Sequence, residues 1–188
     1  MGLKKNKIFC ISYPRTGTKS IAKAFDDLGY KSWHFNKNDC DEVLKVLKDG
    51  SFSKQILDFY DFFVDVPIFL IYKDLDKLYP ESKFILITRE KNGWAKSMKN
   101  MLVGAKSNSH YKKINDITWP NFCSQSIMDH TKEVKEYFFN REDDLLVEDL
   151  TKINYNILCD FLNIENDKKG FPHSTKYIDR FYKKRRDI

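Results

Sequence analysis

Residues 8–20 read Ile-Phe-Cys-Ile-Ser-Tyr-Pro-Arg-Thr-Gly-Thr-Lys-Ser, and this stretch decides the fold. Its first part, residues 8–11, is a short apolar run of strand-favouring residues that Pro14 ends, which predicts a buried strand. Residues 20–28 then carry apolar side chains at steps of three and four, typical of an amphipathic helix that Gly29 terminates. A strand, a tight turn and a helix in this order form half of a β-α-β unit.

The same alternation continues through the rest of the chain. Further strands are predicted at 31–35, 62–66, 84–88 and 145–147. Helices are predicted at 39–47, 68–78, 124–139 and 153–162, with another running through Trp94, Met98 and Met101. This order predicts an α/β fold of three layers, P-loop-like, with a central parallel sheet of about five strands flanked by helices. We expect residues 1–188 to form a single domain, and the polar stretch 104–120 to be a candidate lid.

Composition narrows the class of protein. Hydrophobic residues make up 41% of the chain and aromatic residues 15%, as in a packed globular protein. The net charge of +6 suits an anionic partner. However, 27 acidic residues nearly match 33 basic ones, so we expect no nucleic-acid partner. The basic run 183–186 is interpreted as the solvated end of a terminal helix.

Cysteine spacing and hydropathy predict the compartment. Cys10, Cys40, Cys123 and Cys159 form no C-x-x-C pair, so neither a zinc site nor a disulfide framework is expected. We see no signal peptide and no apolar run long enough for a membrane span. We therefore expect a cytoplasmic protein, and no other group of residues has the spacing of metal ligands.

The turn at residues 13–20 has the chemistry of an anion seat. It follows a strand and precedes a helix, whose unpaired N–H groups and positive dipole end attract an anion. Gly17 allows a ligand to approach the backbone closely, while Arg15, Thr18, Lys19 and Ser20 supply donors. The alternative interpretation is that Arg15 and Lys19 are ordinary exposed charges.

The turn is not a Walker A loop, G-x-x-x-x-G-K-[ST]. If Lys19 and Ser20 supplied the final two residues, glycines would be needed where the chain has Tyr13 and Thr18. A nucleotide kinase or NTPase on this fold therefore stays an alternative, although the sequence also offers no convincing acid to hold Mg²⁺.

Pro-Arg-Thr-Gly-Thr-Lys-Ser, residues 14–20, resembles the 5′-phosphosulfate loop of sulfotransferases that use 3′-phosphoadenosine 5′-phosphosulfate (PAPS). The resemblance implies that PAPS is the co-substrate, that residues 15–20 (Arg15, Thr16, Gly17, Thr18, Lys19 and Ser20) cradle its 5′ end, and that Arg15 stabilises charge on the leaving oxygen. Arg15 stands where Lys is commoner in the family, and Lys19 where Thr or Ser is usual. Arginine keeps its charge but is a poorer proton donor than lysine.

A second motif supports the resemblance. Arg89 follows the clearest predicted strand, and Ser97 comes eight residues later, with Gly93 between them to bend the chain into its helix. In the family, an Arg and a Ser at this spacing grip the 3′-phosphate of the donor, which implies the same role for Arg89 and Ser97. Trp94 either packs under the nucleotide or, as we favour, lies in the core.

Sulfuryl transfer also needs a group that takes the acceptor's proton. Among His34, His110, His130 and His173, we select His34, because it ends a predicted strand at the edge of the sheet where the loop lies. Asp65, also at a strand end, is the second choice, with capping of the next helix as its alternative role.

The resemblance thus predicts sulfuryl transfer from PAPS to a hydroxyl or amine acceptor, without a metal. The acceptor class is a small molecule or a carbohydrate. The chain is short for that family, which is consistent with an acceptor site completed by a second subunit, and so with a homodimer. A non-catalytic anion-binding module on the same fold remains the other alternative.

Overall fold

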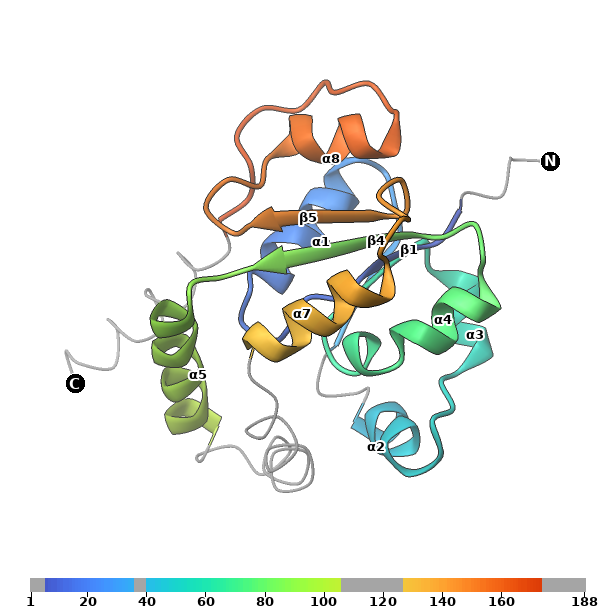
Figure 1. Cartoon of the computed structure of the whole chain (residues 1–188), viewed down its shortest axis with the longest axis vertical. Coiled ribbons are helices and arrows are strands. Elements are labelled where there is room, and N and C mark those ends of the chain that lie inside the picture. The colour runs from blue at the N-terminus through green and yellow to red at the C-terminus, as the bar shows by residue number, and fades with distance from the viewer. Residues whose placement is uncertain (1–5, 36–39, 106–126, 174–188) are drawn as a thin grey trace.

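A computed structural model describes residues 6–35, 40–105 and 127–173 (Figure 1). Five strands form one sheet: β1 (Ile8–Cys10), β2 (Ser32–His34), β3 (Phe62–Val64), β4 (Lys83–Thr88) and β5 (Leu145–Asp149). The helices are α1 (Thr18–Asp27), α2 (Cys40–Asp49), α3 (Lys54–Phe59), α4 (Tyr72–Leu78), α5 (Lys91–Ala105), α7 (Ile127–Tyr137) and α8 (Tyr155–Leu162). The predicted α/β fold with a parallel sheet of five strands is confirmed.

The order of the strands is β2-β3-β1-β4-β5, and every neighbouring pair is parallel. The chain first winds from β1 towards one edge of the sheet and then crosses β1 to build the other half. Strand β1 therefore lies in the middle, with Phe9 aligned to Phe63 on one side and to Phe84 on the other. The loop after β1 sits where the winding direction changes, which is where open α/β sheets bind their ligands.

Helices cover both faces of the sheet, because side chains of a strand alternate between the faces. Phe9 and Ile11 belong to the core under α2, α3, α4 and α7, whereas Ile8 and Cys10 belong to the core under α1 and α8. In Figure 1, α8 lies above β5, and α7 and α4 lie below β4, while α1 overlaps these two strands in this view. Helix α5 stands apart from both layers, beyond the arrowhead of β4. It is therefore placed to contact the loops at the carboxyl edge.

Several element boundaries differ from those predicted. The expected helix 68–78 is broken into a 3₁₀ helix, Ile68–Leu70, and α4. The short helix α3 was not predicted, and β3 ends at Val64 instead of residue 66 because Asp65 leaves the extended conformation, with φ of 82°. Helix α1 begins at Thr18, two residues earlier than expected. This shift places Thr18, Lys19 and Ser20 in the first helical turn.

Some predictions lie outside the described residues: most of the candidate lid 104–120, His110, Cys123 and the basic run 183–186. Cys10 and Cys159 are buried free thiols. Within the described ranges, no helix is both long and apolar enough to cross a membrane.

The stacked rings of Phe25 and Phe62 hold α1 on the sheet, with centroids 3.8 Å apart and planes 6° from parallel. Both rings are fully buried. We predict that Phe62→Ala lowers the free energy of unfolding by about 3–5 kcal/mol, because it leaves a cavity between helix and strand. Urea unfolding measures this change. Phe139→Ala is the matched control: its ring is 73% exposed, so a change beyond about 0.5 kcal/mol is not expected. Equal losses in the two variants would contradict this account of the core.

Candidate functional site

The loop between β1 and α1 has an unusual backbone. Arg15 and Gly17 both adopt left-handed conformations, with φ of 72° and 89°. Glycine does so at little cost, but a left-handed arginine is strained by about 1–2 kcal/mol. The Thr16 hydroxyl donates to the Tyr13 carbonyl oxygen over 2.7 Å and tightens the turn. Strain of this kind persists only where the surroundings impose it, and it is common at binding sites.

The loop ends in the N-terminus of α1, with Gly17 as the capping residue. The Ser20 and Ile21 N–H groups donate to the Gly17 carbonyl oxygen, over 2.9 and 3.1 Å. The N–H groups that precede them in the first turn have no carbonyl behind them in the helix. That turn contains no acidic residue, but it contains Lys19, which is exposed. The helix end at which the anion seat is expected therefore has a positive dipole and a nearby cation.

Two side chains from the other half of the sheet hold the loop carbonyls. Arg89, after β4, donates from Nη1 to the Arg15 carbonyl oxygen over 2.7 Å. Trp94, in α5, donates from Nε1 to the Pro14 carbonyl oxygen over 2.7 Å, and its ring packs against Tyr13. Trp94 is half-buried and packs against the core on this side of the sheet, the alternative that we favour. Its contacts with Pro14 and Tyr13 also tie it to the loop.

The second predicted motif lies beside the first. Arg15 donates from Nε to the Ser97 hydroxyl over 3.1 Å, although the residues are 82 positions apart. Ser97 is in the second turn of α5, and Arg89 precedes that helix. The structure thus brings Arg15, Arg89 and Ser97 together. The chain turns into α5 at Glu90, whose carboxylate accepts the N–H of Gly93 over 2.7 Å, so Gly93 is not the bend that the sequence indicated.

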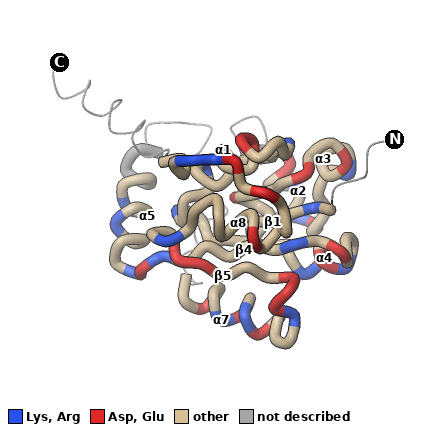
Figure 2. Tube along the Cα trace, turned by 90° about the horizontal axis from the view of Figure 1, so that it is seen from above, with Lys and Arg blue, Asp and Glu red and all other residues tan. Residues whose placement is uncertain are grey.

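Figure 2 shows Lys and Arg spaced along α5 at this end of the molecule. The exposed residues of α5 include Lys91, Lys96 and Lys99, and the helix contains no Asp or Glu. They add to the positive charge of Arg15, Lys19 and Arg89 near the carboxyl edge of the sheet, where the acidic residues Glu90 and Asp149 also lie.

On the other side of the loop, His34 and Asp65 form a pair. His34 is the last residue of β2, and Asp65 follows β3. Their closest atoms, His34 Nε2 and Asp65 Oδ2, are 3.1 Å apart, and the side chains are 20% and 17% exposed. The Thr18 hydroxyl lies 3.3 Å from each of these two atoms. The two residues predicted as alternative proton acceptors are therefore one cluster, joined to the first residue of α1.

The geometry of Asp65 excludes its alternative role as a helix cap. Its Oδ1 accepts the N–H of Val66 over 2.9 Å, while the 3₁₀ helix after Pro67 has no side-chain cap. Burial alone would raise the pKa of Asp65, but the hydrogen bond and charge of His34 outweigh it and lower that pKa. For His34, burial lowers the pKa, and Asp65 more than compensates, so the pKa is raised. Each group stabilises the charge of the other.

The other described histidines lie elsewhere. His130, in α7, is buried, and its Nε2 is 2.7 Å from the Ile11 carbonyl oxygen, so it supports the end of β1. His173 is exposed. No group of three or more His, Cys, Asp or Glu with metal-site geometry occurs among the residues that the structure describes.

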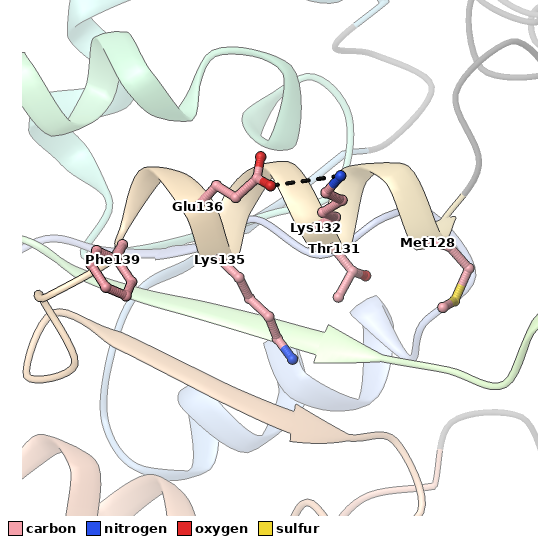
Figure 3. A pocket seen from close by; sticks show the side chains of 6 residues that line it. All are labelled: Met128, Thr131, Lys132, Lys135, Glu136 and Phe139. Atoms are coloured by element: carbon pink, nitrogen blue, oxygen red, sulfur yellow. Dashed lines mark ion pairs between the residues drawn. The ribbon is translucent and has the colours of Figure 1, made fainter.

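A shallow hollow on α7 contains none of the predicted site residues (Figure 3). All of its lining residues come from that one helix or its end: Met128, Thr131, Lys132, Lys135, Glu136 and Phe139.

Sequence reasoning missed two contributors to the site. Leu150, after β5, packs under Gly17 so closely that a Cβ on Gly17 would lie 2.5 Å from Leu150 Cδ1. The buried Ser12 hydroxyl accepts the Ile87 N–H over 2.6 Å and ties the start of the loop to β4. Neither residue belongs to a motif, and both contacts join segments that are distant in the sequence.

Comparisons of the sequence with known proteins found a matching family model and a curated relative. A family model described as "Sulfotransferase domain" matches residues 7–126, well over half of the chain. A curated relative from Aspergillus versicolor, "Ava biosynthesis cluster protein M", is 32% identical over 113 residues. The alignment covers 52% of this chain and 43% of that protein, so the chain spans less than half the length of its relative. The two motifs described in the sequence analysis, at residues 14–20 and 89–97, both lie inside the region that the family model matches.

Gly17 offers a test of how the loop is held. We predict that Gly17→Ala lowers the free energy of unfolding by about 1–2 kcal/mol for the left-handed backbone. The clash with Leu150 then adds about 1–3 kcal/mol. The control is Gly29→Ala: Gly29 also has a positive φ, of 81°, but nothing lies within 4 Å of an added Cβ. Urea unfolding of both variants separates the two costs. If Gly17→Ala and Gly29→Ala lowered the free energy of unfolding equally, the Leu150 side chain would be able to move away at little cost and would not fix the loop.

Proposed function

The chain belongs to the sulfotransferase-domain family, and on that premise we propose that it transfers a sulfuryl group from PAPS to a hydroxyl or amine acceptor. The observation that carries the proposal is the convergence of Arg15, Arg89 and Ser97 at the N-terminus of α1. PAPS is anionic at both its 3′-phosphate and its 5′-phosphosulfate. A helix end and two guanidinium groups suit such a ligand, because charge-assisted hydrogen bonds to phosphate are strong.

In this proposal, the two ends of the donor have separate seats. The 5′ end lies on residues 15–20, where the N–H groups of α1 and Lys19 face it. The 3′-phosphate is gripped by Arg89 and Ser97. A guanidinium has five N–H donors, so Arg89 can hold the Arg15 carbonyl and a phosphate at the same time. In this proposal, the Arg89 side chain both shapes the loop and binds the 3′-phosphate.

The reaction breaks the bond between sulfur and the oxygen that bridges it to the 5′-phosphate, and forms a bond between sulfur and the acceptor. Negative charge grows on the bridging oxygen as it leaves. Arg15 and the first N–H groups of α1 stabilise that charge, since fixed donors aimed at developing charge are a large catalytic term. Arg15 acts here as a cation and not as a proton donor, because the arginine pKa is too high. The proton of the acceptor goes to the His34–Asp65 pair.

The remaining expectations stay predictions. We propose a small-molecule or carbohydrate acceptor, a single sulfotransferase-like domain over residues 1–188, a cytoplasmic location and a homodimer that completes the acceptor site. The name of the Aspergillus versicolor relative specifies no substrate, and the family match ends at residue 126. An acceptor screen becomes worthwhile once the donor is established.

The donor site is tested by calorimetric titration with 3′-phosphoadenosine 5′-phosphate, the desulfated product. We predict tighter binding of this compound than of 5′-AMP, or of ATP with Mg²⁺. Arg89→Ala should remove most of the preference for the 3′-phosphate, because each hydrogen bond to a charged group contributes about 1.5–3 kcal/mol. That is a loss of about 10- to 150-fold in affinity.

Lys99→Ala is the matched control, since Lys99 is an exposed cation on α5, the helix that follows Arg89. The affinity of the Lys99→Ala variant for 3′-phosphoadenosine 5′-phosphate should stay within a few-fold of that of the wild type. A preference for ATP with Mg²⁺ would point to the kinase alternative. If the protein bound none of these nucleotides, the result would point to the non-catalytic anion-binding module. Equal affinity in wild type and Arg89→Ala would remove Arg89 from the 3′-phosphate site.

A further inference from the structure

The surroundings of His34 decide its protonation state. Its Nδ1 is 2.9 Å from the Phe35 carbonyl oxygen, and its Nε2 is 3.1 Å from Asp65 Oδ2. A backbone carbonyl and a carboxylate only accept hydrogen bonds. Both ring nitrogens therefore face acceptors. Either neutral tautomer would turn one nitrogen lone pair towards an oxygen, and only the doubly protonated ring donates to both.

The Thr18 hydroxyl is consistent with this state. It lies 3.3 Å from Asp65 Oδ2 and 3.3 Å from His34 Nε2. A hydroxyl has one hydrogen to donate. If it donates to Asp65, the carboxylate receives Thr18 and His34 on Oδ2 and the Val66 N–H on Oδ1, so its negative charge is well supported. Thr18 then orients the carboxylate and leaves the His34 ring to donate.

The charged groups that face His34 come from two elements. Asp65, after β3, makes the hydrogen bond and the attractive charge contact, while Lys19, in α1, acts weakly in the opposite direction. Burial also disfavours the charged ring, and the net effect is a raised pKa for His34. The geometry and the electrostatics therefore favour the same state, a cationic ring beside an ionised carboxylate.

We propose that His34 and Asp65 act as an imidazolium–carboxylate pair, in which Asp65 accepts the acceptor's proton and His34 is the cation that positions Asp65. This assignment of roles rests on the proposed sulfotransferase function. The acceptor O–H or N–H bond breaks, its proton binds to the Asp65 carboxylate, and its electron pair forms the new bond to sulfur. The electrons of the broken sulfur–oxygen bond stay on the 5′-phosphate.

Asp65 is suited to this role by its place and its backbone. Its side chain is 17% exposed, close to the 20% of His34, so the carboxylate is not sealed from solvent. Its φ of 82° is strained for a non-glycine residue, and this conformation directs the carboxylate to Thr18 and His34. A weak base is sufficient where the transition state is loose, as in phosphoryl transfer by protein kinases, in which an Asp takes the proton of the substrate hydroxyl.

The protonation state is tested directly by ¹⁵N NMR of the histidine rings across a pH titration, assigned with His34→Gln. We expect the His34 ring to keep both protons to a higher pH than an ordinary histidine, which is mostly neutral at about pH 7. His130 is the internal control: it is buried among aromatic rings, its pKa is lowered, and it should stay neutral at that pH. In Asp65→Asn, the pKa of His34 should fall below its ordinary value, because burial, the largest effect, is then opposed only by the hydrogen bond with the Phe35 carbonyl.

Asp65→Asn is chosen over Asp65→Ala because asparagine tolerates a left-handed backbone. A His34 ring that loses a proton at or below the ordinary histidine pKa would overturn the ion pair. This readout needs no catalytic activity, so it is independent of the proposed function.

The kinetic test uses hydrolysis of PAPS, with water as the acceptor. Asp65→Asn should reduce kcat by about 10²–10⁴-fold, as expected for loss of a proton acceptor, and leave the affinity for 3′-phosphoadenosine 5′-phosphate within a few-fold of wild type. His34→Gln should reduce kcat less. In the wild type, kcat should fall as pH rises through the pKa of His34 measured by NMR, and this dependence should vanish in His34→Gln.

A kcat that rises with pH through that pKa would make His34 the base and overturn the assignment. If the protein neither binds the desulfated product nor hydrolyses PAPS, the proposed function fails, while the NMR result on the ion pair stands by itself.

Discussion

The hold of Arg89 and Trp94 on two consecutive carbonyl groups is the interaction on which the site depends. Arg89 bonds the Arg15 carbonyl and Trp94 bonds the Pro14 carbonyl, each over 2.7 Å. Arg15 would not keep a left-handed backbone by its own preference, so the turn needs partners that impose this shape. These partners come from the residue after β4 and from α5, and the loop they shape sets the position of the N-terminus of α1. A rigid seat of this kind binds an anion without first having to order itself.

The order of the strands explains why the site has two sides. Because β1 lies between β3 and β4, its loop meets the ends of both halves of the sheet. The half that contains β4 supplies Arg89 and, through α5, Ser97, and these residues suit the 3′-phosphate of the proposed donor. The half that contains β2 and β3 supplies His34 and Asp65, which suit the acceptor's proton. Thr18 contacts the second side from the first residue of α1, so the two halves of the proposed reaction meet at the start of one helix.

The ion pair of His34 and Asp65 changes how a histidine near a reaction centre is interpreted. A histidine with one nitrogen oriented by a carboxylate and the other open to substrate is a good base. Here both ring nitrogens of His34 face oxygen atoms, one from the Phe35 carbonyl and one from the Asp65 carboxylate. The Asp65 side chain is itself partly exposed. The hydrogen-bonding partners, and not the residue type, decide which member of the pair can accept a proton.

The sequence by itself determined the fold class, five parallel strands between helices, because apolar periodicity and turn residues are local signals. It also named Arg15, Gly17, Arg89 and Ser97 as candidate site residues, through two motifs with fixed spacing. It could not determine that the helix expected at 68–78 is broken, or that Asp65 leaves β3 with a positive φ, since tertiary contacts override local preference there. Only the tertiary structure decided that His34 and Asp65 are one pair, that Trp94 holds the loop and that Leu150 lies under Gly17. Those contacts join strand ends that are distant in the sequence, and it is the order of strands in the sheet that brings them together.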